Sequence, residues 1–114
     1  MRKTKNGRNN FVLIGGQNIE IKKIPVQKGL ELLFSGAPLF GKIVGQLTLE
    51  DFSKLAQENT AILIDIVAAC AERESWWIAQ NASLPQLIEA LLVADNLNGF
   101  TLAFGYIRAM GWVE

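Results

Sequence analysis

The chain has 114 residues, of which half are hydrophobic and 19% are charged. That composition describes one folded domain of ordinary size and excludes a disordered or low-complexity chain. The formal net charge is zero, but residues 1–28 carry seven Lys or Arg and one Glu, whereas residues 29–114 carry four basic and ten acidic side chains.

The first ten residues are basic and polar and show no hydrophobic periodicity, so we expect residues 1–10 to form a flexible arm. Three roles are open for this arm: a solvated tail, an assembly contact with the acidic body, or a contact with nucleic-acid phosphates. The third role is weakened because the predicted helices are acidic and carry no cluster of Arg, Lys, Asn or Gln that could read base edges. Residues 11–114 are expected to form a single domain.

The apolar run Phe11–Ile14, a turn of Gly and Asn composition and the alternating Ile19 and Ile21 predict a β-hairpin with its apolar face on helices. Pro25 can open a helix, and Gly36 can end it, so a helix is predicted over residues 26–35. One face of this helix is apolar and is expected to be buried; it comprises Val26, Leu30, Leu33 and Phe34.

A long helix is predicted over residues 48–73, because apolar side chains recur there at spacings of three and four. Thr48 supplies a cap, with Asp51 three residues later. Such a helix would be roughly 35 Å long and would need at least two covering elements. The fold class that follows is mainly α: a small bundle of three to four helices with a short N-terminal β-hairpin.

The C-terminal part begins with a second capping signal, in which Ser83 precedes Pro85 and Gln86. The helix that follows shows a stripe of large aliphatic side chains, expected to face the core: Leu84, Leu87, Ile88, Leu91, Leu92 and Leu97. A break is expected over residues 96–99. The apolar pattern then resumes in a last predicted helix, with Phe100, Leu102, Phe104, Ile107 and Met110.

No arrangement of reactive side chains typical of an enzyme is visible. The chain has no histidine, which removes the commonest general base, and its single cysteine excludes zinc sites built from Cys and His. Cys70 is expected to be a core residue with no neighbour that lowers its pKa. Asp65 is expected at the rim of the apolar face or in a salt bridge with a basic N-terminal residue. We therefore expect no catalysis, no metal and no cofactor.

Neither a signal peptide nor a membrane-spanning segment is predicted. The most apolar stretch, residues 61–71, is eleven residues long and contains Asp65, which makes it too short and too charged to cross a bilayer. A cytoplasmic protein is the expectation.

Several bulky side chains fall in predicted connectors rather than in helices. Leu39 and Phe40 lie in a loop next to Pro38, where they either fold back on the core or form an exposed patch. Trp76 and Trp77 are adjacent, and neighbouring helical residues point about a third of a turn apart, so one is expected in the core and the other at the rim. Tryptophan is enriched in binding hot spots, so the rim residue is a candidate contact.

The order of these elements resembles the tail assembly chaperones of long-tailed bacteriophages. The shared features are the strand pair, the short helix from Pro25, a helix opened by Thr-Leu-Glu-Asp-Phe at residues 48–52, a Trp-containing connector and a Leu-Pro-Gln-Leu-Ile-Glu-Ala-Leu-Leu helix at residues 84–92. Asn98 and Phe100 approximate the Asn and aromatic residues that end the helix in that family. This chain departs from the pattern by inserting Gly99 and by continuing to Glu114.

The resemblance implies a non-enzymatic protein without a cofactor, in the cytoplasm of a bacterial host. Such a protein binds the apolar tape-measure protein, recruits tail-tube subunits and self-associates. On this reading the partner-binding residues are Leu39, Phe40, Trp76, Trp77 and Phe100. Two alternatives stay open: a small nucleic-acid-binding regulator that uses the basic arm, and a structural tail or head completion subunit.

Overall fold

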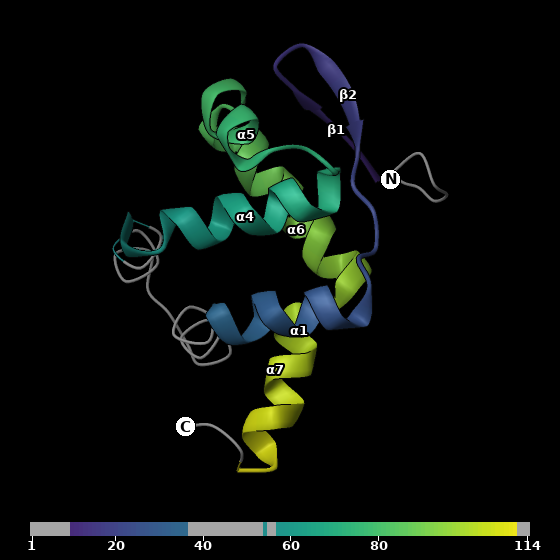
Figure 1. Ribbon diagram of the computed structural model, residues 1–114, viewed down its shortest axis with the longest axis vertical. Helices are drawn as coiled ribbons and strands as arrows, with labels where there is room; N and C mark the ends of the chain where they lie inside the picture. Colours follow the sequence, from purple (N-terminus) through teal and green to yellow (C-terminus); the bar gives the residue numbers. More distant parts are fainter. Residues whose placement is uncertain (1–9, 37–53, 55–56, 112–114) are drawn as a thin grey trace.

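The computed structural model describes residues 10–36, 54 and 57–111. The molecule measures 41 × 28 × 28 Å; a hairpin and α5 lie at one end, and α7 projects at the other (Figure 1). In chain order the elements are β1 (Phe11–Ile14), β2 (Gln17–Glu20), α1 (Val26–Ser35), α4 (Thr60–Ala71), α5 (Ser75–Asn81), α6 (Leu84–Asn98) and α7 (Phe100–Ala109).

The predicted hairpin is confirmed, with antiparallel pairing from Phe11 opposite Glu20 to Ile14 opposite Gln17. Gly15 and Gly16 form its two-residue turn with φ of +58° and +80°, the backbone that matches the twist of the flanking strands and that glycine adopts at least cost. The composition predicted a turn over residues 15–18, but the turn consists of Gly15 and Gly16 alone, because Gln17 and Asn18 belong to β2. The inner face of the hairpin is buried and consists of Val12, Ile14 and Ile19.

Helix α1 has the predicted bounds, starting after Pro25 and ending before Gly36. Its predicted buried face is only partly right. Leu33 is buried, but Val26 is 79% exposed, Leu30 and Phe34 are about half exposed, and Leu32 is the second buried residue instead. The helix therefore contacts its neighbours through Leu32 and Leu33 in its second half, and the other apolar side chains face outward along its length.

The single long helix predicted over residues 48–73 is wrong where the structure describes it. Helix α4 begins only at Thr60, after Asn59 leaves helical geometry with φ −122° and ψ 26°. It ends at Ala71, because Glu72 adopts the left-handed conformation with φ +57°. Asparagine is a poorer helix former than the leucine and alanine residues of the apolar repeat on either side, which favours a break at this position. The predicted cap at Thr48 lies outside the described residues.

Helix α5 contains both adjacent tryptophans, and the loop after it leads into α6. The predicted capping box is present: the Ser83 Oγ accepts from the Gln86 N–H at 3.4 Å, and the Ser83 N–H donates to Gln86 Oε1 at 2.9 Å. The predicted leucine stripe is only partly buried, since Leu84, Ile88 and Leu92 are exposed. Ala90 and Ala94 instead form the fully buried line of α6, which packs against α4 and β1.

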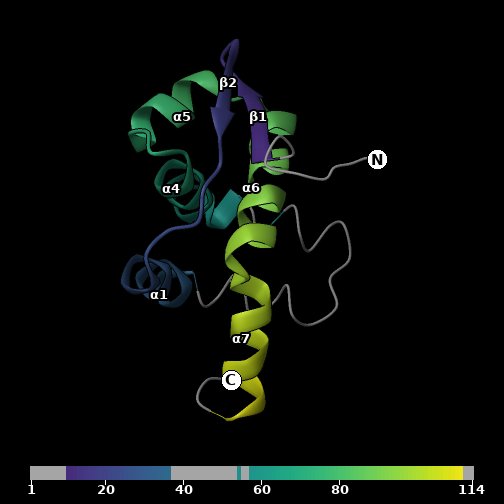
Figure 2. The same cartoon turned by 90° about the vertical axis from the view of Figure 1, so that its right-hand side faces the viewer.

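Gly99 forms the predicted break. It has φ +70° and serves as the C-cap of α6 and the N-cap of α7, which are bent by 57° with respect to each other. Figure 2 shows α7 continuing below the body of the molecule from this bend. Phe100, Phe104 and Ile107 are its buried residues, whereas Leu102 and Met110 face outward, so the last predicted apolar pattern splits between two faces.

The predicted fold class is confirmed: the protein is mainly helical with an N-terminal two-stranded hairpin. The described residues hold five helices, because the tryptophan connector is itself a short helix and Gly99 separates α6 from α7. One core joins the hairpin, α1 and the C-terminal helices; its largest fully buried side chains are Phe104, Ile14, Ile21, Ile78, Val12, Val67 and Cys70.

Among the described helices, none is by itself long and apolar enough to cross a membrane. Only α6 and α7 taken together reach that length and composition, and the 57° bend lies between them.

Candidate functional site

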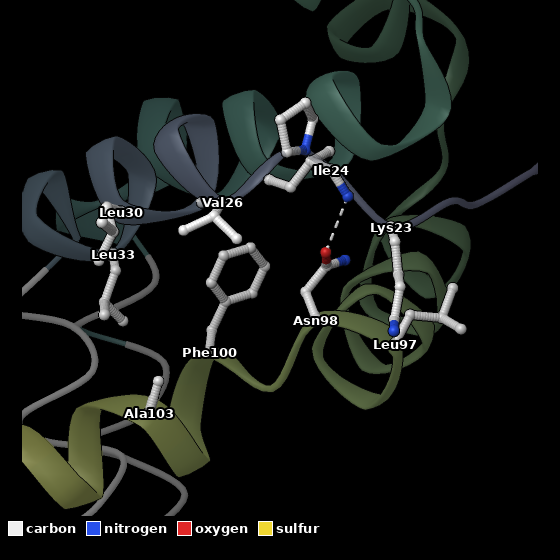
Figure 3. A pocket seen from close by; sticks show the side chains of 11 residues that line it. Lys23, Ile24, Val26, Leu30, Leu33, Leu97, Asn98, Phe100 and Ala103 are labelled. Atoms are coloured by element: carbon white, nitrogen blue, oxygen red, sulfur yellow. Dashed lines mark hydrogen bonds between the residues drawn. The ribbon is translucent and has the colours of Figure 1, made fainter.

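Among the residues that the structure describes, a candidate to hold another molecule is an apolar groove between the start of α1 and the α6–α7 junction, which we call the α1–α7 groove (Figure 3). Its volume is about 350 Å³. The segment before α1, the exposed side of α1 and both sides of the Gly99 bend line it: Lys23, Ile24, Pro25, Val26, Gly29, Leu30, Leu33, Leu97, Asn98, Phe100 and Ala103.

Asn98 fixes the geometry of this groove by joining its two walls. Its Oδ1 accepts from the Ile24 N–H at 2.9 Å, and its Nδ2 donates to the Ala94 carbonyl at 3.0 Å. Longer contacts run from the same Nδ2 to the Lys22 carbonyl at 3.4 Å and to the Cys70 Sγ at 3.5 Å. One amide therefore holds the segment that precedes α1 against the last turn of α6.

The floor of the groove is buried while its rim is exposed. Phe100 is 4% exposed, and its ring points from the start of α7 toward α1, near Val26 (Figure 3). Val26 and Leu30 stand at the rim with large exposed fractions, one helical turn apart on α1. Branched aliphatic side chains around a buried aromatic ring can receive the apolar side chain of another chain.

The groove carries one charged lining residue, Lys23, which belongs to the segment before α1 (Figure 3). A cation at the edge of an apolar surface favours a partner that brings a carboxylate next to its apolar contact. The other residues that line the groove are uncharged, and most of them are apolar.

A second depression, of about 450 Å³, lies where α1 and α4 meet the start of α5. Charged side chains of both signs line it, and several of them already interact: Lys28 with Glu31 at 3.7 Å, and Asp65, which accepts from the Ser75 Oγ at 2.7 Å. Because the charges offset each other, this depression concentrates no field of one sign. The α1–α7 groove is therefore the stronger candidate.

The residues predicted to contact a partner are not brought together. Leu39 and Phe40 lie outside the described residues, and Phe100 forms the floor of the groove. Trp76 is 60% exposed on α5, whereas Trp77 is half-buried against the core with the Arg73 guanidinium 5.4 Å from its ring centroid. The predicted rim tryptophan is therefore Trp76, whereas the predicted core position is only partly right, since Trp77 packs against the core without being fully buried.

Cys70 and Asp65, the residues with the most reactive side chains in the predicted long helix, both occupy structural positions. Cys70 is fully buried, as predicted; burial raises the pKa of its thiol to about 11, and the hydrogen bond from Asn98 offsets only part of this rise. Asp65 is exposed, as the predicted rim position requires, and it bonds Ser75. Within the described ranges Asp65 forms no salt bridge; Lys22 pairs with Glu72 and Lys28 with Glu31.

The sequence did not identify the groove residues Lys23, Val26, Leu30 and Leu97 as a surface. The spacing of Val26, Leu30 and Leu97 suggested buried faces. A sequence pattern of apolar residues on one side of a helix is the same whether the protein's own core or a partner chain covers that side. The role of Asn98 was also missed, since its contact with Ile24 joins positions 74 residues apart. The Asn-Gly pair at the end of α6 was the only local signal, and it indicated a helix end rather than a clamp.

Within the described ranges, no group of three or more His, Cys, Asp or Glu side chains is placed to hold a metal ion. Comparison of the chain with protein-family models, curated proteins and solved structures finds no match.

Proposed function

We propose that this protein is a non-enzymatic assembly chaperone that binds an apolar helical segment of a partner in the α1–α7 groove. The observation that carries the proposal is the groove itself, in which a buried phenylalanine floor is surrounded by exposed aliphatic side chains of α1. In soluble proteins a contiguous exposed apolar surface of this kind is typical of an interaction site.

We further propose that the partner is a tape-measure protein of a long-tailed bacteriophage, and that the chain also recruits tail-tube subunits, in the cytoplasm of the bacterial host. Support for this identity comes from the element order described above, which resembles the tail assembly chaperones. The confirmed hairpin, α1 and the capped α6 match parts of that order. A long apolar helical partner is also what an apolar groove of this size can cover by laying one helix face into it.

The groove suggests a simple mechanism. Aliphatic side chains of the partner helix, spaced by one turn, would pack on Val26 and Leu30 and above Phe100, which removes them from water. A partner carboxylate near Lys23 would fix the direction of the helix. Because the contacts are few and the groove is open, such binding is reversible, as a chaperone that later releases its partner requires.

The test is co-expression with a tape-measure fragment, comparing wild type with Val26→Glu. Val26 occupies the first position of α1, where a carboxylate is favoured by the helix dipole, so the substitution leaves the fold intact while adding charge to the groove rim. Wild type should keep the fragment soluble, and Val26→Glu should return most of it to the pellet.

The matched control is Leu84→Glu, which adds the same charge to an exposed apolar residue at the first position of α6, away from the groove. It should behave like wild type. If the fragment precipitates equally with and without wild-type protein, the proposed function is wrong. If Leu84→Glu and Val26→Glu lose the fragment equally, the chaperone activity stands but its assignment to the groove does not.

A further inference from the structure

Each strand of the hairpin has one edge that faces away from the other strand. Along an antiparallel strand the residues alternate: one bonds the neighbouring strand, and the next directs its backbone N–H and C=O away from it. The Ile21 N–H donates to the Asn10 carbonyl at 2.8 Å, which fixes this alternation in the hairpin. The even-numbered residues of β1 therefore bond β2, whereas Phe11 and Leu13 direct their backbone groups outward.

The outward edge of β1 is unpaired and apolar. In the part of the chain that the structure describes, no hydrogen bond reaches the backbone N–H or C=O of Phe11 or Leu13. Their side chains lie on the outer face of the hairpin and are 44% and 52% exposed, since Val12 and Ile14 form the inner face. Two donors and two acceptors thus lie beside two large apolar side chains. An unpaired strand edge of this kind is a template for another extended chain.

The outward edge of β2 carries features that hinder such pairing. Its outward residues are Asn18 and Glu20, which are polar or charged and exposed. The next outward N–H along this edge belongs to Lys22, and it donates at 2.9 Å to the carbonyl of Cys70 in the last turn of α4. Helix α4 therefore ends against this edge and limits the length of strand that can add there. Of the two edges, that of β1 is better suited to receive a strand.

The charge of the chain near β1 indicates which extended segment fits this edge. The ten residues that precede β1 carry four basic side chains and no acidic one. A segment flanked by carboxylates is attracted to this end of the molecule, whereas a second copy would bring the same basic residues with its own β1. The partner that the charges favour is therefore another protein with acidic residues beside the segment.

We propose that the β1 edge binds an extended, acid-flanked segment of a partner protein, which adds a third strand to the hairpin. Its backbone makes four hydrogen bonds, two with Phe11 and two with Leu13. Apolar side chains at alternate positions of the segment pack beside those of Phe11 and Leu13 on the outer face. A third strand also stabilises a hairpin, which is marginal when it has only two.

This edge and the α1–α7 groove are separate surfaces. Neither Phe11 nor Leu13 lines the groove, and the hairpin lies at the end of the molecule opposite α7 (Figure 1). The proposal therefore does not depend on the proposed function. A failed co-expression test leaves strand addition at β1 unaffected, and a failed peptide-binding test leaves the groove unaffected.

The first experiment measures amide hydrogen exchange by nuclear magnetic resonance while a synthetic peptide is added. The probe peptide has three valines alternating with threonines and two glutamates at each end. At saturation it should slow exchange of the Phe11 and Leu13 amides at least tenfold, and it should leave the outward amides of Asn18 and Glu20 nearly unchanged. The same peptide with proline at its central valine should have no effect, because proline cannot continue a ladder. A peptide with lysines at its ends should bind at least threefold more weakly.

The second experiment compares proline substitutions at two facing positions of the hairpin. Leu13 and Asn18 are opposite each other, and the N–H of each points away from the other strand. Proline at either position removes an outward donor but no hydrogen bond of the hairpin, and edge strands tolerate it there. Leu13→Pro should weaken peptide binding at least tenfold, whereas Asn18→Pro should bind like wild type. Circular dichroism and thermal unfolding check that both variants fold.

Four results would overturn the proposal: no binding of the probe peptide, slowed exchange at Asn18 and Glu20 in place of Phe11 and Leu13, equal loss of binding in both proline variants, or equal binding of the acidic and basic peptides. Exchange at Phe11 and Leu13 that slows with protein concentration alone would assign the edge to a second copy and also overturn it. If Leu13→Pro does not fold, the exchange measurement on wild type decides the question.

Discussion

The hairpin end and the α7 end of the molecule use similar apolar side chains in opposite ways. At the hairpin end, Val12, Ile14 and Ile78 are buried to within 2%, because α6 packs on β1 and the hairpin turn reaches α5. At the other end, Leu102 and Tyr106 are more than 60% exposed. The difference lies in how many elements surround each region, so composition alone does not say which apolar residues stabilise the fold and which are available for binding.

The largest expected effect compares two aromatic residues of α7. Phe104→Ala should lower the free energy of unfolding by about 3–5 kcal/mol, because Phe104 is 1% exposed and its removal leaves a cavity. Tyr106→Ala, two residues away on the exposed face, should change it by less than about 0.5 kcal/mol. Urea denaturation at low protein concentration measures both, and equal losses would show that the two faces of α7 are equally packed.

A second test concerns Asn98, which holds the segment before α1 against the last turn of α6. Asn98→Ala should cost about 2 kcal/mol, because it leaves the partly buried Ile24 N–H without its acceptor. Asn96→Ala, an exposed asparagine in the same turn, is the control and should be near neutral. Hydrogen exchange would locate the change: Asn98→Ala should deprotect the Ile24 amide specifically. If the two variants unfold alike, Asn98 is not a clamp.

The third test uses the buried thiol of Cys70 in α4. Because the pKa of Cys70 rises from an ordinary value of 9.0 to about 11 in the folded state, the unfolded chain loses this proton first. The resulting stability is therefore fully present below pH 9 and is lost as the pH rises toward 11. Relative to Cys70→Ala, which shares every other titrating group, wild type should lose about 1.4 kcal/mol by pH 10. Parallel pH profiles would contradict the assignment.

The smallest effect separates the two glycines of the hairpin turn. Alanine is strained at both positions, at roughly 1 kcal/mol each, because both have positive φ. At Gly15 the new Cβ would also lie 2.9 Å from the Asn81 Cβ, whereas at Gly16 no heavy atom lies within 4 Å. Gly15→Ala should therefore be about 1 kcal/mol more destabilising than Gly16→Ala in thermal unfolding. Equal values would mean that the turn does not press on α5.

Signals that act over a few residues allowed good predictions from the sequence. The hairpin, the bounds of α1, the Ser83 capping box and the Gly99 break depend on backbone preferences of neighbouring residues, and each is present. The hydrophobic periodicity was less informative about which face of a helix is buried. On α6 it favoured the large aliphatic residues, including Leu84 and Leu92, yet the helix faces its neighbours with Ala90 and Ala94. Small residues permit the close approach to α4 and β1, and the larger ones stay outside.

The candidate site was less predictable than the fold. Of the five residues named as partner contacts, Phe100 lines the groove, and Trp76 and Trp77 lie on α5. The groove exists because Asn98 joins segments far apart in sequence, and no local pattern encodes such a contact. The break of the predicted long helix at Asn59 was missed for a related reason: its apolar repeat continues across the polar residues that interrupt the helix.

The direction in which α7 leaves α6 is set by the backbone conformation of one residue, Gly99. Its space is open, so only its backbone conformation requires glycine there. With an ordinary helical residue in its place, α6 and α7 could run on as one straight rod roughly 39 Å long. In such a straight helix Phe100 would no longer point toward α1, and the α1–α7 groove next to Val26 would be lost. The bend at Gly99 therefore forms one side of the groove and also directs α7 away from the body of the molecule.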